Sequence, residues 1–239
     1  MAKIATPKIA STIILVRPDV SGVFEVFMTR RPQEMKFLGG FYVFPGGTIR
    51  KGDYSPKMLA RCYGRSHEEA QRLLGNQQSP ELSLGHWVGG IRELYEEVGI
   101  LLCVTETGEP LVIDQEETRG RLAEKRKTLV AGSTEFSLIL ESERLYCDIG
   151  SPTYFYHRVT PKKYSMRFDT RFFLARLPAK QTPLASSQEV METLWITPKA
   201  ALDLHEGGGL PIMPPTVTSL TTLAGFESWD HLCARYNLR

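Results

Sequence analysis

The amino-acid sequence predicts an α+β fold in which a mixed β-sheet lies between layers of helices, an α/β/α sandwich. Two observations favour this fold class. Segments with strand and helix patterns alternate irregularly along the 239 residues, and the first two strand patterns lie close enough together to form a hairpin. In addition, no G-x-G-x-x-G motif follows a predicted strand, which disfavours a dinucleotide-binding unit built on a parallel sheet.

The composition is that of an ordinary globular protein, with 42% hydrophobic and 23% charged residues. We therefore expect residues 1–239 to form a single domain. The net charge is +2 and the Lys and Arg residues are scattered, so no nucleic-acid partner is expected. The four cysteines lie far apart and no apolar run is long enough to cross a membrane. These features predict reduced thiols, no membrane partner and a cytoplasmic location.

Strands are predicted where β-branched and other apolar residues are dense and turn residues flank them. The predicted strands cover residues 8–16, 23–29, 41–44, 101–105, 154–159, 171–177 and 189–196.

Helices are predicted from apolar residues at helical spacing and from residues that begin or end helices. Ser66 with Glu69 three positions later forms a capping-box pattern, and Ser133 precedes another helix pattern. The predicted helices cover 55–64, 66–75, 84–97, 114–131, 134–144 and 198–206, with two more between 214 and 236.

An acidic helix is central to the functional prediction. Glu93, Glu96 and Glu97 are spaced i, i+3 and i+4, which places them on one face, and Gly99 supplies the left-handed position at which a helix ends. Like charges at this spacing repel each other by about 0.2–0.5 kcal/mol per pair. A divalent cation would offset this repulsion, because Mg²⁺ prefers oxygen ligands. Taken alone, the same pattern also fits a solvated surface.

A second feature is the Pro45-Gly46-Gly47 segment, which follows a short apolar strand. Two adjacent glycines let the backbone come close to a phosphate and offer N–H groups to it. An ordinary turn is the alternative for this segment on its own.

These features combine into a motif that resembles the Nudix box. Gly47 is followed after five residues by Asp53, and residues 92–100 read R-E-L-Y-E-E-V-G-I. The second part matches the family pattern Arg-Glu-apolar-x-Glu-Glu-x-Gly-apolar at every fixed position. The first part differs, because Asp53 stands where Glu is usual and residues 54–91 replace a spacer of seven. We expect residues 54–87 to form a helical insertion within the box, either a lid beside the site or a surface excursion.

The insertion is similar to that of a Nudix branch that includes the peroxisomal coenzyme A diphosphatases and their bacterial relatives. The R-F-D-T-R-F-F segment at 167–173 and the W-I-T-P segment at 195–198 resemble elements of that branch. So does the Pro-Pro-Thr start of a C-terminal helical extension within 210–239. The coenzyme A motif that ends at Phe-Pro-Gly-Gly is matched from Gly40 to Gly47, but Lys36 replaces its Arg and Pro32 replaces its Ser. Lys keeps the charge and loses the bidentate fork of Arg.

The resemblance implies metal-dependent hydrolysis of the pyrophosphate bond in a nucleoside diphosphate linked to another moiety. Glu93, Glu96 and Glu97 would hold Mg²⁺ or Mn²⁺. The proton of the attacking water would pass to Glu93, to Glu96 or to a downstream carboxylate, for which Glu189 is preferred and Glu192 is the competitor.

Other residues of the motif take supporting roles in the family. Arg92 and Gly99 would be structural, and Arg92 would orient the catalytic glutamate. The candidate residues for binding the nucleotide-containing substrate are Arg31, Lys36, Gly46, Gly47 and Arg167.

Coenzyme A or an acyl-coenzyme A is the expected substrate, with adenosine 3′,5′-bisphosphate and 4′-phosphopantetheine as the products. Pyrophosphatases for ADP-ribose, NADH or a diadenosine polyphosphate are alternatives, as is a catalytically silent nucleotide-binding regulator. Silent domains typically lose the carboxylates of the box, and this sequence keeps three. The sequence leaves a homodimer possible.

Overall fold

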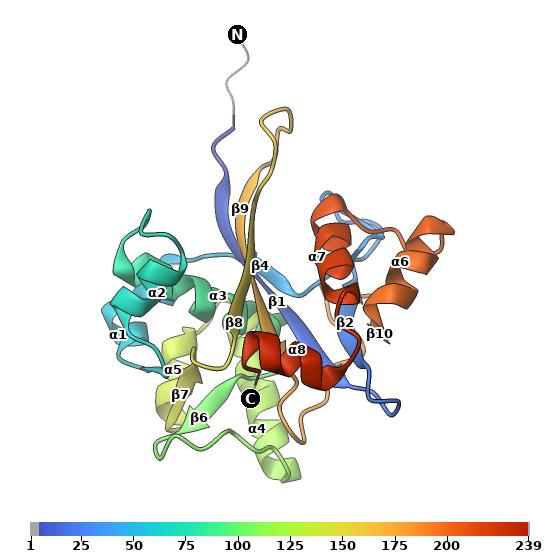
Figure 1. The fold of residues 1–239 in the computed structure, drawn as a ribbon. Helices are drawn as coiled ribbons and strands as arrows, with labels where there is room; N and C mark the ends of the chain where they lie inside the picture. Colours follow the sequence, from blue (N-terminus) through green and yellow to red (C-terminus); the bar gives the residue numbers. More distant parts are fainter. Residues whose placement is uncertain (1–4, 239) are drawn as a thin grey trace.

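A mixed β-sheet forms the centre of the protein (Figure 1). The computed structural model describes residues 5–238. The sheet has seven strands with the main order β10-β2-β1-β9-β8, while β3 pairs with β2 and β4 pairs with β1. Only the β1–β9 pair is parallel among these pairings. The mixed sheet and the α+β class predicted from the sequence are therefore confirmed.

The strands of the two sheets have bounds that mostly lie within two or three residues of the predicted ones. The large sheet contains β1 (Lys8–Pro18), β2 (Phe24–Arg30), β3 (Tyr42–Val43), β4 (Gly46–Thr48), β8 (Thr153–Val159), β9 (Phe168–Arg176) and β10 (Glu192–Ile196). A second sheet of three strands, in the order β5-β7-β6, contains β5 (Cys62–Tyr63), β7 (Leu145–Asp148) and β6 (Cys103–Thr105).

Alternation along the central strands builds a core on each face of the large sheet. Ile13 and Leu15 of β1 point to one face and belong to one buried cluster, whereas Ile14 and Val16 point to the other and belong to a second. Helices α1 to α5 supply the first cluster and α6 to α8 supply the second, so the sheet lies between two helical layers (Figure 1).

Several helices begin at a capping side chain. Ser66, Ser79 and Thr197 each accept a hydrogen bond from a backbone N–H of the first turn. The helices are α1 (Pro56–Leu59), α2 (His67–Leu73), α3 (Pro80–Val98), α4 (Glu116–Val130), α5 (Phe136–Ser142), α6 (Pro198–Glu206), α7 (Pro214–Ala224) and α8 (Trp229–Tyr236), and η1 (Lys51–Tyr54) is a 3₁₀ turn.

Several predicted elements differ from the structure. The predicted helix at 55–64 is only one turn long, since residues 62 and 63 pair with β7 as a strand, and β7 itself was not predicted. The predicted strand at 41–44 shrinks to Tyr42–Val43, and Gly46–Thr48 is a strand on β1 rather than a turn. Ser133 does not cap α5, which begins after Glu135.

Residues 54–87 contain α1, β5, α2 and the first part of α3. Their buried side chains Met58, Ala70 and Trp87 join the same core as the rest of α3. Residues 1–4 and 239, which the single-domain prediction includes, lie outside the described residues. Within residues 5–238, no helix is both long and apolar enough to cross a membrane.

Candidate active site

Helix α3 presents the three predicted carboxylates beside β4. The helix is nineteen residues long and almost wholly buried, and it ends at Gly99, whose φ of 76° is left-handed. Glu93 and Glu97 are 8% and 6% exposed, and Glu96 is partly exposed. These carboxylates therefore do not lie on a solvated face, which was the alternative for this helix.

A close contact between β4 and α3 positions Glu93. A Cβ atom added to Gly47 would lie 2.6 Å from the Cδ atom of Glu93, so only glycine leaves room for this carboxylate. Gly47 itself pairs with Ser11 of β1, which fixes β4 on the sheet. A Cβ atom on Gly46 would lie 2.4 Å from the carbonyl oxygen of Ser11. The two glycines thus allow sheet, turn and helix to meet at one point.

Arg92 joins both ends of the motif. Its guanidinium donates to both carboxylate oxygens of Asp53, at 2.7 and 2.9 Å, and to the carbonyl oxygen of Thr48 at 3.0 Å. It also donates to Glu93 at 2.7 Å and to Glu96 at 3.2 Å. Its side chain is only 2% exposed. This arrangement supports the structural role that the family resemblance implies for Arg92.

Burial and neighbouring charges raise the pKa of two of the glutamates, Glu93 and Glu97. Burial raises the pKa of Glu97 well above its usual value, and the negative charges of Glu93 and Glu189 raise it further. Arg31 and a hydrogen bond from the backbone of Gly46 act in the opposite direction. Burial also raises the pKa of Glu93, against the effect of Arg92. At Glu97, burial and the neighbouring negative charges therefore outweigh the opposing effects of Arg31 and of the Gly46 backbone.

The structure distinguishes the two downstream candidates. Glu189 lies in the loop before β10, not at the start of a strand as predicted, and it lines the same cavity as Glu93. Glu192 accepts a hydrogen bond from the hydroxyl of Tyr42, lies 3.6 Å from Arg30 and is not among the residues that line this cavity. Position therefore favours Glu189.

A cavity of about 590 Å³ opens beside the carboxylates. Three of the five residues predicted to bind substrate, Arg31, Gly46 and Gly47, line this cavity, whereas Lys36 and Arg167 do not. Lys36 is exposed in the loop before β3. The guanidinium of Arg167 donates to the backbone oxygens of Thr160 and Ala5, at 2.9 and 2.7 Å. Arg167 thus holds the base of the β8–β9 connection.

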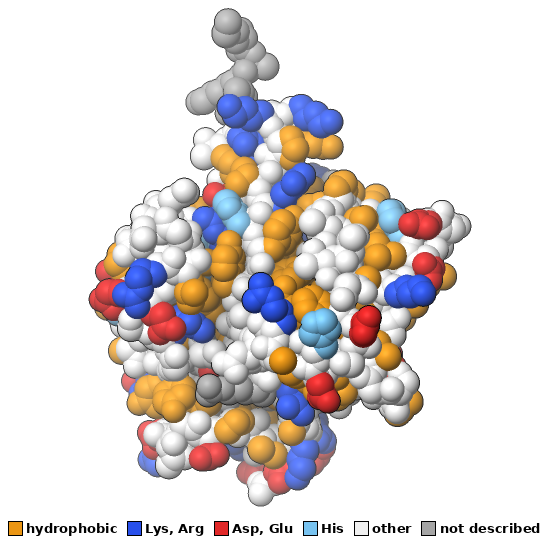
Figure 2. All heavy atoms as spheres, in the orientation of Figure 1, with side chains coloured by type: hydrophobic (Ala, Val, Ile, Leu, Met, Phe, Trp, Pro, Cys, Tyr) orange, Lys and Arg blue, Asp and Glu red, His pale blue; other side chains and the backbone are white. Residues whose placement is uncertain are grey.

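The cavity also contains residues that sequence reasoning missed. Two of its four cationic side chains, Arg158 and Lys163, lie on and after β8. Lys and Arg side chains gather at the end of the hairpin that connects β8 and β9 in Figure 2. Arg50 lines the cavity near Glu93. Apolar and aromatic side chains complete the walls, among them Phe37, Leu38, Phe44, Tyr164, Met166, Phe168 and Met213. No residue from 54–87 is among the described residues that line it.

The donor set fits a hard divalent cation. Glu93, Glu96, Glu97 and Glu189 offer carboxylate oxygens, the ligand type that Mg²⁺ prefers. Burial, together with the charges of Glu93 and Glu189, raises the pKa of Glu97, and a bound cation would oppose this effect. Within residues 5–238, however, no three side chains of His, Cys, Asp or Glu are gathered as a metal-binding group. Arginines contact Glu93 and Glu96 instead.

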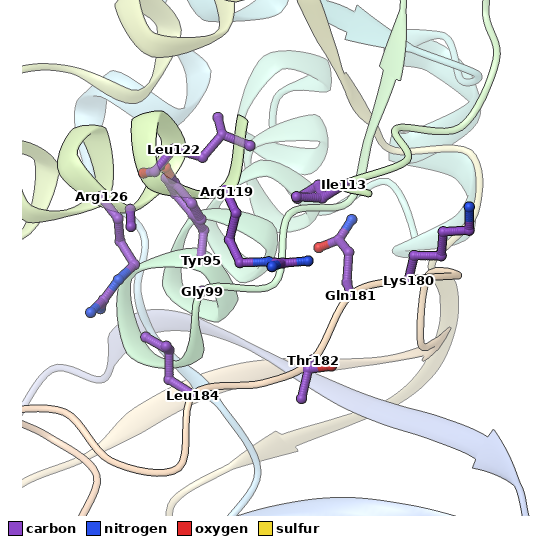
Figure 3. Close-up of a pocket in the computed structure, with 11 residues that line it drawn as sticks. Tyr95, Gly99, Ile113, Arg119, Leu122, Arg126, Lys180, Gln181, Thr182 and Leu184 are labelled. Carbon is purple, nitrogen blue, oxygen red and sulfur yellow. The ribbon is translucent and has the colours of Figure 1, made fainter. Parts of the chain in front are cut away.

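A second cavity, of about 440 Å³, lies by the C-terminal end of α3 (Figure 3). Tyr95, Leu122 and Leu184 form apolar parts of its wall, and Arg126 donates to the backbone oxygen of Glu96 at 2.5 Å. The described residues that line it include no carboxylate. It therefore lacks the acidic groups that the predicted chemistry needs.

Comparison with known proteins identifies the family of this site. A family model described as the NUDT19 Nudix domain matches residues 81–223. The chain belongs to the Nudix hydrolase family. The enzyme class and the family resemblance deduced from the sequence are therefore confirmed.

Relatives and solved structures agree with this family. The chain is 27% identical over 236 residues to the acyl-coenzyme A diphosphatase NUDT19 of Xenopus laevis, covering 87% of this chain and 62% of the relative. It is 27% identical over 213 residues to the putative Nudix hydrolase 7 of Caenorhabditis elegans, covering 88% and 59%. The chain thus spans about three-fifths of the length of these relatives. A crystal structure of a Nudix hydrolase from Alicyclobacillus acidocaldarius matches with a TM-score of 0.78 and 26% identity, covering 97% of both chains.

Proposed function

We propose that this Nudix enzyme hydrolyses the pyrophosphate bond of coenzyme A or an acyl-coenzyme A. Water adds across the P–O–P linkage, so that adenosine 3′,5′-bisphosphate and 4′-phosphopantetheine, or its acylated form, are released. The observation that carries this proposal is a single cavity that joins the carboxylates of Glu93 and Glu189, two groups of cations and apolar walls. Glu96 and Glu97 lie on the same helix as Glu93 but are not among the described residues that line it.

The two groups of cations suit a substrate with phosphates at two places. Arg31 and Arg50 lie on the motif side of the cavity, whereas Arg158 and Lys163 belong to the β8–β9 hairpin. The first group would contact the diphosphate and the second the separate 3′-phosphate, because guanidinium and ammonium groups bind phosphate oxygens strongly. The apolar side chains offer a surface for the pantetheine arm and an acyl chain. The name of the Xenopus relative points to the same substrate class.

The proposed metal site uses Glu93, Glu96 and Glu97. When bound there, Mg²⁺ or Mn²⁺ supplies neutralisation of the diphosphate charge and a more acidic water. Glu189 lies at the cavity and takes the proton of the attacking water as general base. Arg92 acts on Glu93 and Glu96 by orienting their carboxylates. Gly47 allows β4 to approach Glu93 of α3, and Gly46 allows β4 to approach β1.

ADP-ribose or NADH is the second candidate substrate. The observation in its favour is that the coenzyme A motif is incomplete: Pro32 and Lys36 replace its Ser and Arg, and Lys36 does not line the cavity. A silent nucleotide-binding regulator is disfavoured by the three glutamates of the helix. The cytoplasmic location and the homodimer stay predictions of the sequence.

Turnover of a substrate panel tests the proposal. Coenzyme A, an acyl-coenzyme A, dephospho-coenzyme A, ADP-ribose and NADH are incubated with the protein and Mg²⁺ or Mn²⁺, and products are identified by mass spectrometry. We expect kcat/KM to be highest for coenzyme A or its acyl derivative. Arg158→Gln combined with Lys163→Gln lowers kcat/KM for coenzyme A about tenfold and leaves that for dephospho-coenzyme A unchanged, because a charged hydrogen bond contributes about 1.5–3 kcal/mol. Equal loss for both substrates, or a preference for ADP-ribose, contradicts the substrate assignment.

A further inference from the structure

Arg50 occupies the acidic site from the solvent side. Its guanidinium donates to both carboxylate oxygens of Glu96, at 2.7 and 2.8 Å, and lies 3.7 Å from a carboxylate oxygen of Glu93. The side chain of Arg50 is 51% exposed, whereas those of Glu96 and Glu93 are 9% and 11% exposed. Arg50 therefore neutralises two carboxylates that are themselves nearly inaccessible.

Arg50 and Arg92 share these carboxylates but differ in freedom. Arg92 is 2% exposed and is also held by Asp53 and by the carbonyl oxygen of Thr48. The guanidinium of Arg50 makes its two hydrogen bonds to Glu96 alone. Its backbone N–H donates to Asp53 at 2.8 Å, which fixes the main chain and leaves the side chain able to move. Of the two arginines, Arg50 is the one that can leave.

The hydrogen bonds of Arg50 occupy the atoms that a metal ion would need. One oxygen of Glu96 accepts from both Arg50 and Arg92, and the other accepts from Arg50. A cation bound to Glu96 would therefore compete with Arg50 for these oxygens.

We propose that Arg50 competes with the divalent metal for Glu96 and Glu93, and that, once displaced, its guanidinium binds the diphosphate of the substrate. The inference rests on the proposed metal-dependent function. Arg50 lines the same cavity as Glu93 and Glu189, so a rotation about its side-chain bonds keeps it within the site. A guanidinium suits both partners, because carboxylates and phosphates each accept its bidentate pair of hydrogen bonds. Metal binding thereby exposes a phosphate ligand.

Manganese binding to the metal-free protein tests the first half of the proposal. The Mn²⁺ affinities of the wild type, Arg50→Gln and Lys51→Gln are measured without substrate by electron paramagnetic resonance. Lys51 is exposed, lies next to Arg50 and carries the same charge, so its variant controls for the general loss of one positive charge. We expect Arg50→Gln to bind Mn²⁺ about two- to fivefold more tightly, the range for breaking a partly exposed ion pair. Lys51→Gln is expected to stay at the wild-type value.

Steady-state kinetics at saturating Mn²⁺ test the second half. We expect Arg50→Gln to raise KM for coenzyme A about tenfold, because a charged hydrogen bond to phosphate is lost. Arg50→Lys recovers part of the loss, and circular dichroism checks that each variant is folded. The two readouts thus change in opposite directions: metal binds better and substrate binds worse.

Several outcomes overturn the proposal. Unchanged or weaker Mn²⁺ binding by Arg50→Gln contradicts the competition between Arg50 and the metal. An equal increase in Mn²⁺ affinity in Lys51→Gln contradicts it as well. An unchanged KM removes the role toward the diphosphate. If the wild type turns over a nucleotide but the variants give either of these results, the proposal for Arg50 fails and the proposed function stands. If the wild type binds no Mn²⁺ and hydrolyses nothing in the panel, both fail.

Discussion

Arg92 donates to both oxygens of Asp53 across the insertion that separates them in the sequence, with distances of 2.7 and 2.9 Å. Both side chains are at most 3% exposed. The pair connects the first part of the Nudix motif to the second, so the helix and the loop remain aligned although residues 54–91 lie between them in the chain.

Removing the carboxylate of this pair is expected to destabilise the protein. Asp53→Ala leaves the buried guanidinium of Arg92 without its bidentate partner, which costs about 3–5 kcal/mol of unfolding free energy. Urea denaturation measures the change. Asp53→Glu keeps the charge and introduces the residue usual in the family, so we expect a smaller loss. Equal stability of Asp53→Ala and the wild type would show that the pair does not hold the motif together.

Glu97→Gln is expected to lower kcat at least about a hundredfold with Mg²⁺, since a step assisted by a metal loses several kcal/mol of transition-state stabilisation. The metal-free variant should stay folded, because glutamine removes a buried charge whose pKa is raised. Single-turnover kinetics and thermal unfolding measure the two effects. Glu117→Gln, at an exposed position of α4, is the matched control. Near-wild-type turnover by Glu97→Gln argues against its role as a metal ligand.

The two downstream glutamates should respond differently to the same substitution. Glu189→Gln is expected to lower kcat about 10²–10⁴-fold, the usual contribution of a general base. Glu192→Gln should change kcat by less than about threefold, because its carboxylate is engaged with Tyr42 and Arg30 outside the cavity. The reverse result would exchange the assignments.

His86 predicts a loss of stability in acid. Burial lowers its pKa from 6.5 to about 3, and its ring bonds to Ser11 at 3.0 Å and to Gln78 at 2.9 Å. The unfolded chain therefore takes up a proton below pH 6.5 that the folded protein does not. The contribution of neutral His86 to the free energy of unfolding is complete above pH 6.5. It falls by about 1.4 kcal/mol for each pH unit below that value.

Urea denaturation between pH 7.5 and 4.5 measures this dependence. The quantity to compare is the slope of the free energy of unfolding against pH. We expect His86→Gln to show a shallower slope than the wild type, whatever its stability at neutral pH. His231→Gln, at an exposed position on α8, should keep the wild-type slope. Parallel slopes for the wild type and His86→Gln would exclude His86 as the source.

Much of the fold follows from local sequence patterns. Pro198–Glu206 has the predicted bounds, because Thr197 caps it and three glycines follow it. The missed elements have partners far away in the chain. Residues 46–48 become a strand only because β1 lies beside them, and a pairing register cannot be derived from a Pro-Gly-Gly segment.

In the candidate site too, local sequence patterns predicted some residues, whereas residues that depend on distant contacts were missed. The spacing predicted that Glu93, Glu96 and Glu97 share one helix, which is α3, but not that Glu93 alone of the three lines the cavity. Arg158 and Lys163 were not predicted, because they reach the cavity only through the fold of the β8–β9 hairpin. Nothing in the sequence around them distinguishes them from surface cations. Arg50 lies inside the motif, but at a position that the family pattern leaves variable. Its role depends on pairing with Glu96 in space, 46 positions later.

The parallel pairing of β1 with β9 has a consequence for synthesis of the chain. Lys8 pairs with Phe168, 160 positions later, and the pairing continues to Val16 and Arg176. The β1–β2 hairpin can form early, but its apolar strands stay without the neighbouring strand until most of the chain has left the ribosome. Contacts of such long range slow folding and leave strand edges open to aggregation. Nascent chains that stop before residue 168 are therefore the ones we expect to need a chaperone.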